Sequence, residues 1–175
     1  MAFDRAHGGR RLLSDPFPRL IVKDGPKRAI PDYEPVLGGI PLVSNAFRLL
    51  VESVEPGVHQ FEPLSVNWKD GSYAANMYLF IICNALDSIA ADHVEGVRER
   101  YELDDGRTLL GPWEAPNGFA LKRPVFDLSI VRDVCIWQDE FMNTSPNFPF
   151  CSDVFKEAYD ASGLVGAAFR PHGTV

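Results

Sequence analysis

The chain has 175 residues, of which 46% are hydrophobic and 23% charged, and its formal net charge is −7. This composition is typical of a globular protein and excludes intrinsic disorder, and the acidic balance argues against a general nucleic-acid binder, which normally presents a basic face. A domain of this length buries roughly 70% of the surface of its unfolded chain, so a packed core is expected without a stabilising metal or disulfide.

Residues 1–40 are rich in Gly, Pro and Arg and contain one short apolar run, Leu20-Ile21-Val22. They predict an N-terminal arm with one candidate strand. After the arm, apolar residues recur every three or four positions over Phe47–Val54, with Ser44 placed as a cap and Pro56-Gly57 as a stop. This spacing predicts an amphipathic helix with one buried stripe.

Two β-hairpins are predicted in the middle of the chain. The first joins Val58–Asn67 to Ser72–Cys83, and the second joins Val94–Leu103 to Arg107–Leu110. Each connection contains Asp-Gly, a dipeptide that favours tight hairpin turns. A short helix is expected between the two hairpins, over Ala85–Asp92.

The last third of the chain is expected to start with a loop and to end with a strand. In chain order we predict a loop over Gly111–Pro124, strand segments at Val125–Ile130 and Val134–Trp137, a second amphipathic helix over Asp153–Ala161, and a strand over Val165–Phe169. Together the elements predict a single α+β domain with a mostly antiparallel sheet and two main amphipathic helices.

Two segments 108 residues apart are similar to each other. Pro41–Arg48 (PLVSNAFR) aligns with Pro149–Lys156 (PFCSDVFK), which suggests an internal duplication. In each segment a serine, Ser44 or Ser152, precedes a predicted helix and is expected to cap it. A cap of this kind stabilises a helix by about 1 kcal/mol, so we interpret both serines as structural.

The cysteines and histidines are too scattered for a metal site. Cys83, Cys135 and Cys151 lie far apart in apolar surroundings, as expected of buried free thiols in a reducing compartment. No metal-ligand spacing, nucleotide fingerprint or catalytic motif is present. Residues 1–20 lack the apolar stretch of a signal peptide, and the longest apolar window, Met77–Cys83, is far shorter than the roughly 20 residues of a spanning helix. We expect a cytoplasmic protein without a cofactor.

Two sequence patterns carry a resemblance to a known family. A Ser, a helix and then Gly-Leu-x-Gly-x-x-Phe stand here as Ser152–Phe155 and Gly163–Phe169, and a strand running into Leu-Asp stands as Tyr73–Tyr78 and Ala85–Asp87. In these residues the chain resembles a family of bacterial polymorphic-toxin immunity proteins named after a myxobacterial polyimmunity protein. The resemblance implies an immunity-type α+β domain over residues 41–175. It also implies a cytoplasmic antidote that is encoded beside a toxin, and that this toxin is delivered by contact-dependent or type VI-like secretion.

Acidic residues are concentrated between Asp87 and Glu114, where eight Asp/Glu stand against three Lys/Arg. A solvated hairpin face explains this about as well as a docking surface does, and a turn alone accounts for the Asp-Asp-Gly sequence. If it is a docking surface, alternation along a strand places Glu95 and Glu99 on one face toward a basic toxin cleft. The candidate toxin-binding residues are Glu95, Glu99, Glu102, Asp104, Asp105 and Trp113. A tryptophan at the end of a strand more often covers the core than anchors an interface, although interface hot spots favour tryptophan.

The leading functional hypothesis is stoichiometric inhibition, in which the protein binds a cognate toxin and occludes it without catalysis. Two alternatives remain open. One is an enzyme-like antidote that reverses the toxin's modification, for which Asp87, His59 and His93 are the candidate residues. The other is a regulatory interaction domain unrelated to toxins. No nucleic-acid, membrane or small-molecule partner is expected.

Overall fold

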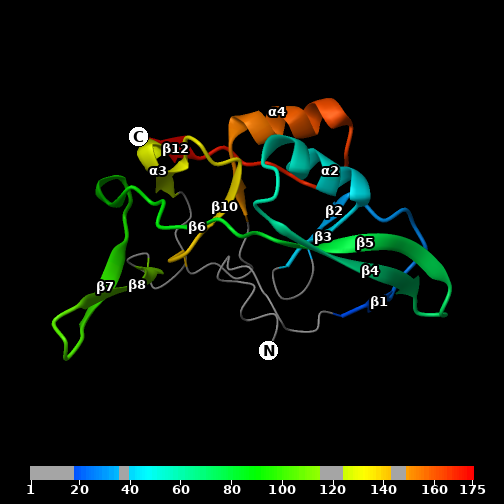
Figure 1. Cartoon of the computed structure of the whole chain (residues 1–175), viewed down its shortest axis with the longest axis horizontal. Coiled ribbons are helices and arrows are strands. Elements are labelled where there is room, and N and C mark those ends of the chain that lie inside the picture. The colour runs from blue at the N-terminus through cyan, green and yellow to red at the C-terminus, as the bar shows by residue number, and fades with distance from the viewer. Residues whose placement is uncertain (1–17, 36–39, 115–123, 143–148) are drawn as a thin grey trace.

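The computed structural model describes residues 18–35, 40–114, 124–142 and 149–175 (Figure 1). The described chain is an α+β domain, and five of its eight strand pairs are antiparallel, as predicted. None of the described helices is long and apolar enough to cross a membrane.

The largest sheet has five strands in the order β1-β4-β5-β3-β2. Its centre is the hairpin of β4 (Gln60–Trp68) and β5 (Tyr73–Ile81), which confirms the first predicted hairpin. On one side β1 (Leu20–Lys23) runs parallel to β4, and on the other β3 (Leu42–Val43) pairs with β5 and then with β2 (Tyr33–Glu34). The N-terminal arm therefore contributes two strands, because residues 18–35 lie along both edges of the sheet.

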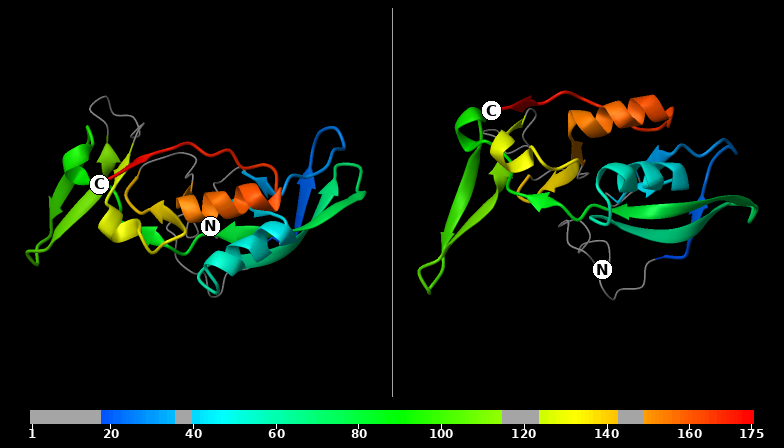
Figure 2. Two further views of the ribbon diagram at one scale, coloured as in Figure 1. Left: turned by 90° about the horizontal axis from the view of Figure 1, so that it is seen from above. Right: turned by 45° about the horizontal axis from the view of Figure 1, so that its top comes forward.

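Both faces of the central strand β5 are buried. Alternate residues point to opposite faces of a strand, and here Met77, Leu79 and Ile81 belong to one apolar cluster while Phe80 belongs to another. The second cluster lies under two helices, α2 (Asn45–Val54) and α4 (Asp153–Ser162), which pack against each other above the sheet (Figure 2). The cluster is held together by contacts among aromatic rings of the helices and of the sheet: Phe47 with Phe80, Phe155 and Tyr159.

The two helices begin in the same way. The hydroxyl of Ser44 accepts a hydrogen bond from the N–H of Phe47 at 3.1 Å, and that of Ser152 accepts one from the N–H of Phe155 at 3.4 Å. The two serines also share the same backbone conformation, with φ −73° and ψ 166° or 163°. Each is preceded by a two-residue strand, β3 or β11 (Phe150–Cys151). The two similar segments therefore fold into the same strand–cap–helix unit.

The two units differ after their helices. The strand predicted over Val165–Phe169, at the end of the second unit, is wrong. This segment follows Gly163, whose φ of 72° ends α4. It then runs along the β2 edge of the five-stranded sheet without forming regular strand pairing. There the carbonyl of Val165 accepts a hydrogen bond from the N–H of Tyr33 at 3.2 Å. The last strand lies further on, as β12 (Gly173–Thr174).

The Gly-Leu-x-Gly-x-x-Phe pattern has a structural explanation in this segment. A Cβ on Gly166, whose φ is 113°, would lie 2.1 Å from the carbonyl oxygen of Tyr33, so only glycine lets the two backbones approach. Phe169 packs against Tyr159 of α4, with ring centroids 5.2 Å apart. The pattern thus fixes the C-terminal segment to the edge of the sheet.

The remaining elements surround a third apolar cluster that contains Trp113 and Trp137. They include a three-stranded sheet in the order β11-β10-β6, in which β10 is Ile136–Asp139 and β6 is Ala85–Leu86. A second, parallel pair is formed by β9 (Val125–Phe126) and β12. The short helix α3 (Leu128–Val131) and the 3₁₀ turn η1 (Ala91–His93) complete this part.

Two predicted elements in this part are wrong. The predicted helix over Ala85–Asp92 is replaced by β6 and an extended segment, because Ser88 is completely buried and donates from its N–H and its hydroxyl to the carboxylate of Asp139, at 2.9 and 2.8 Å. The predicted strand over Val125–Ile130 stops after two residues, because Asp127 accepts from the N–H of Ser129 and caps α3.

Candidate functional site

The second predicted hairpin is confirmed, and it projects away from the rest of the molecule (Figures 1 and 2). It consists of β7 (Val97–Glu102) and β8 (Thr108–Glu114), joined by a turn in which Gly106 has a φ of 81°. Residues 111–114 belong to β8, so the loop predicted over Gly111–Pro124 is wrong at its start, and its residues 115–123 lie outside the described part of the chain. An irregularity opposite Arg98–Arg100 lets the strand pairing continue as far as Glu114.

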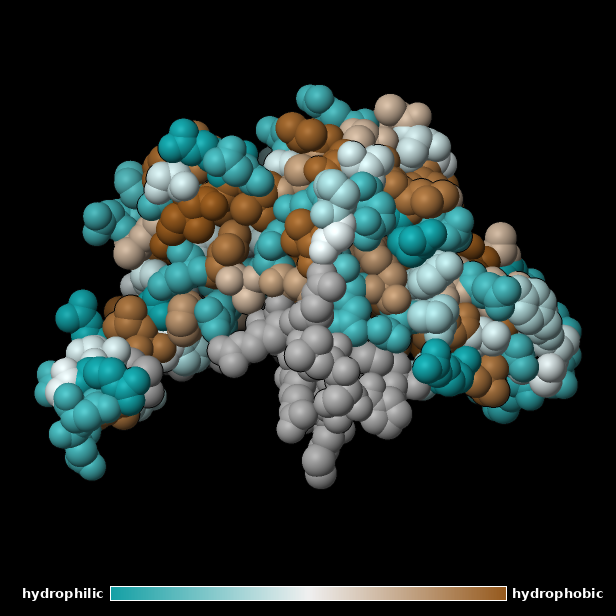
Figure 3. Space-filling model, viewed as in Figure 1, coloured by the Kyte–Doolittle hydropathy of each residue, from teal (hydrophilic) through white to brown (hydrophobic). Residues whose placement is uncertain are grey.

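Five of the six candidate toxin-binding residues are acidic and lie on or next to this hairpin. Glu102, Asp104 and Asp105 are exposed at its tip, where Asp105 pairs with Arg107 at 2.7 Å. Glu95 is exposed but precedes β7, so the predicted alternation of Glu95 and Glu99 within one strand is wrong, and Glu99 lies in the strand itself. The fold thus places four of these acidic residues, all but Glu95, on a single protruding element with a hydrophilic tip (Figure 3).

Trp113, the sixth candidate, is a core residue. Only 5% of it is exposed, and it belongs to the third apolar cluster together with Phe126 and Trp137. Its backbone N–H donates to the carbonyl of Phe141 at 2.7 Å, which ties the base of β8 to the body. Because a buried indole is out of reach of a partner docking on this surface, we remove Trp113 from the candidate contacts.

Arg98, which is not among the residues predicted from the sequence, anchors the base of the hairpin. Its side chain is 8% exposed and donates from Nη1 to both carboxylate oxygens of Asp87, at 3.0 and 2.8 Å, and from Nε to the carbonyl of Gly111 at 2.9 Å. The guanidinium lies over the ring of Phe141 at 3.9 Å and over that of Trp113 at 5.5 Å. A planar cation suits this sandwich between rings and carboxylate. The available signal was an arginine placed across a hairpin from a tryptophan.

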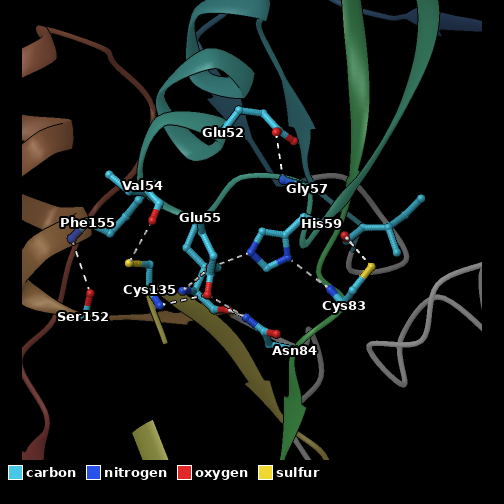
Figure 4. Close-up of polar contacts among 12 residues, drawn as sticks. Glu52, Val54, Glu55, Gly57, His59, Cys83, Asn84, Cys135, Ser152 and Phe155 are labelled. Atoms are coloured by element: carbon cyan, nitrogen blue, oxygen red, sulfur yellow. Dashed lines mark hydrogen bonds and ion pairs between the residues drawn. The ribbon is translucent and has the colours of Figure 1, made fainter. Parts of the chain in front are cut away.

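A buried polar cluster centred on Glu55 lies away from the hairpin (Figure 4). Glu55 directly follows α2, and its two carboxylate oxygens accept four hydrogen bonds at 2.8–3.1 Å. The donors are the Nε2 of His59, the Nδ2 of Asn84, and the backbone N–H groups of Cys135 and Ile136. One carboxylate therefore joins α2, β4, the end of β5 and β10.

The electrostatics of this cluster are those of a stable, satisfied group. Burial opposes the charge of Glu55, but the hydrogen bonds from His59, Cys135 and Ile136 outweigh burial, and the pKa of Glu55 is lowered from 4.5. The Nδ1 of His59 accepts from the N–H of Cys83 at 3.2 Å, so Nε2 is the ring nitrogen that donates to Glu55. We interpret the Glu55–His59 pair as a hydrogen bond that connects secondary-structure elements.

Comparison with known protein families identifies the chain. It matches the model of the immunity protein family Imm11 over residues 3–174. The chain belongs to this family. A search of curated proteins finds no match. The resemblance to a toxin-immunity family is thus confirmed, and it indicates toxin neutralisation, with a toxin protein as the partner of this immunity protein.

The candidate residues of an enzyme-like antidote occupy three different environments in this immunity protein. The His59 side chain is fully buried, Asp87 is held by Arg98, and His93 is exposed in η1. Burial also raises the pKa of the Cys151 thiol, to about 11, which leaves that thiol protonated and weakly nucleophilic. Among the described residues, no group of His, Cys, Asp or Glu could hold a metal ion.

Proposed function

We propose that this immunity protein neutralises its toxin by direct, stoichiometric binding, and that the β7–β8 hairpin is the contact element. The observation that carries the proposal is the exposed acidic tip, Glu102 with Asp104 and Asp105, at the end of a protruding ribbon. An acidic surface speeds encounter with a basic partner above the roughly 10⁵–10⁶ M⁻¹s⁻¹ of uncharged pairs.

The anchored base of the hairpin supports the same proposal. Arg98 and Trp113 fix the hairpin to the body, so the tip is presented in a defined direction. An element held in its binding geometry loses less conformational entropy when it binds. Inhibition then requires only that the hairpin cover the toxin's working surface, with no bond made or broken. We place this encounter in the cytoplasm, where the three cysteines, free in the structure, are stable.

Co-expression with the toxin encoded beside the gene tests the proposal. Native mass spectrometry of the purified protein should give a complex of fixed stoichiometry, and the protein should restore growth to cells that express the toxin. The double charge reversal Asp104→Lys/Asp105→Lys should slow association by about tenfold at low salt, with a smaller effect at high salt.

A matched reversal on another surface is the control. Asp133 and Glu157 are also exposed, and Asp133→Lys/Glu157→Lys changes the net charge by the same amount. This variant should associate nearly as fast as the wild type. Failure to form a complex or to rescue growth would reject direct neutralisation. Equal slowing by the two double variants would mean that net charge matters and the hairpin does not.

A further inference from the structure

Exposed apolar side chains extend across three strands of the five-stranded sheet, beyond the part that α2 covers. The guanidinium of Arg48 in α2 lies over the ring of Tyr78 at 5.2 Å. Further along the sheet, toward the β4–β5 turn, Leu20 is 50% exposed, Val22 58% and Tyr73 62%. These three residues belong to β1 and β5, the two strands that flank β4.

The strand register places these side chains on one face of the sheet. Ile21, between Leu20 and Val22, packs into the apolar cluster on the side of the sheet away from the helices, so its two neighbours point to the side of the helices. Val22 pairs with Asn67 of β4, and Asn67 pairs with Tyr73 of β5. Directly paired residues share a face, and a shift in the register just before Asn67 brings Tyr73 to this one.

The centre of this face is polar but uncharged. Ser65 pairs with Leu20 on one side and with Asn76 on the other, and its hydroxyl donates to the Oδ1 of Asn76 at 3.4 Å. None of the residues described on this face carries a charge. We call the set the open face, and it consists of Leu20, Val22, Ser65, Asn67, Tyr73 and Asn76.

The composition of the open face is typical of a protein interface. The core of an interface is depleted in charged residues and enriched in aromatic ones, and tyrosine, serine and asparagine are prominent in the contact loops of antibodies. The amide of asparagine both donates and accepts hydrogen bonds, and so does the hydroxyl of serine. The face is therefore able to form hydrogen bonds with a copy of itself.

The distribution of charge favours a second copy of the chain as the partner at this face. Each chain has a net charge of −7, so two copies repel each other, and the uncharged open face adds nothing to that repulsion. At the adjoining turn, charges pair within the chain as Lys69–Asp24 and Lys27–Asp70, at 2.6 and 2.7 Å. A basic toxin is attracted to the acidic hairpin instead, which lies at the opposite end of the molecule (Figure 1).

We propose that two copies of the protein associate through their open faces in a two-fold symmetric dimer. The same residues then occur on both sides of the interface. Leu20, Val22 and Tyr73 contribute apolar contact area, and the serine and asparagine side chains contribute hydrogen bonds. The two hairpins lie at the far ends of such a dimer. The dimer does not depend on the proposed function, but together the two proposals give a complex with two copies of each protein.

Sedimentation velocity of the full-length protein without toxin tests the dimer. The wild type should sediment as a species of twice the 19.5 kDa of one chain and should dissociate on dilution. Val22→Lys and Tyr73→Lys each place two like charges in the interface and should raise the dissociation constant about a hundredfold. Val154→Lys is the matched control, because Val154 is 63% exposed on α4, and it should leave the dissociation constant nearly unchanged. Added salt should strengthen the wild-type dimer by screening the repulsion between acidic chains.

Cross-linking locates the interface independently of these charges. A photoreactive phenylalanine analogue at position 73 should give a covalent dimer on irradiation, and the same analogue at position 154 should not. A wild type that stays monomeric rejects the dimer. A dimer that persists in both open-face variants, or that Val154→Lys weakens equally, shows that the open face is not its interface. If the free wild type is monomeric and the two open-face variants lose toxin binding, the face binds the toxin and the second copy is wrong. Because the free protein is measured, failure of the hairpin contact leaves this test unaffected.

Discussion

Removal of the Glu55 carboxylate should strongly destabilise the fold. In Glu55→Ala, three donors lose their acceptor: the part-buried N–H of Cys135, the buried N–H of Ile136 and the buried Nε2 of His59. The amide of Asn84 keeps a second acceptor, the carbonyl of Ile136 at 2.9 Å. An orphaned buried donor costs about 1–3 kcal/mol, and water entry reduces the sum, so we expect a loss of about 3–5 kcal/mol.

Urea unfolding measures this loss directly, and the thermal midpoint should fall by about 6–20 °C for a chain of this size. Glu52→Ala is the matched control, because Glu52 lies in α2, three residues before Glu55, and among the described residues its carboxylate accepts from the exposed N–H of Gly57. It should cost under about 1 kcal/mol. If Glu55→Ala costs no more than Glu52→Ala, the four hydrogen bonds do not hold the elements together and the reasoning is wrong.

Three further predictions concern stability and use the same unfolding assay. Gly166→Ala should cost at least about 3 kcal/mol, because the new methyl group meets a backbone oxygen at 2.1 Å, whereas Gly25→Ala, with φ 126° and open space, should cost only its backbone strain of about 1–3 kcal/mol. Ser44→Ala and Ser152→Ala should each lose about 1 kcal/mol of cap stabilisation, and Ser44→Ala should cost more in total because the Ser44 hydroxyl also donates to Asp32 Oδ1 at 2.7 Å; a smaller loss for Ser44→Ala than for Ser152→Ala would contradict this. Because the pKa of Glu55 is lower in the folded state, the stability from its charge is complete above pH 4.5 and is lost as the pH falls through the lowered value. The wild type should therefore lose stability more steeply in acid than Glu55→Gln, and parallel curves would refute this.

The sequence predicted the elements that local chemistry specifies. Ser44 and Ser152 cap helices because the signal and its effect lie within three residues of each other. The two hairpins form where Asp-Gly turns separate β-rich segments, again a local signal. The wrong helix at Ala85–Asp92 has the opposite cause, since Ser88 is fixed by Asp139, 51 residues away. Long-range hydrogen bonds of this kind outweigh helix propensity, and they produce no periodic pattern of residues in the sequence.

The candidate site was predicted in part for the same reason. The charge of Glu102 and Asp104 is visible in the sequence, and so is the turn that exposes them. Which face of a strand points inward depends on the neighbouring layer, so the sequence did not show that Trp113 is buried or that Arg98 lies beside it. The hairpin protrudes from the body, which makes its acidic residues accessible to a partner, and this protrusion is a property of the assembled fold (Figure 3).

Arg98 links the stability of the hairpin to its presentation, and its substitution separates the two. Arg98→Ala removes the stacking on Phe141, worth about 2 kcal/mol, the hydrogen bond from Nε to the carbonyl of Gly111, worth about 1 kcal/mol, and a half-exposed ion pair with Asp87, worth under about 1 kcal/mol. The buried Nη2 of Arg98 has no hydrogen-bond partner among the described residues, and losing it recovers about 1 kcal/mol. The free energy of unfolding should therefore fall by about 2–3 kcal/mol, and the loss is confined to the hairpin base.

Hydrogen exchange distinguishes this anchoring role from a contact with the toxin. In the free protein, Arg98→Ala should speed exchange in β7 while leaving β4 and β5 protected, because only the hairpin loses its attachment. Toxin affinity should then fall although Arg98 is buried away from the partner. Arg100→Ala is the contrast, since Arg100 is exposed on the same strand and its loss should leave exchange in the free protein unchanged. Unaltered exchange in β7 of Arg98→Ala would show that the hairpin keeps its position without the arginine, and its rigidity would then have to come from the backbone pairing of Trp113 with Phe141 and Met142 alone.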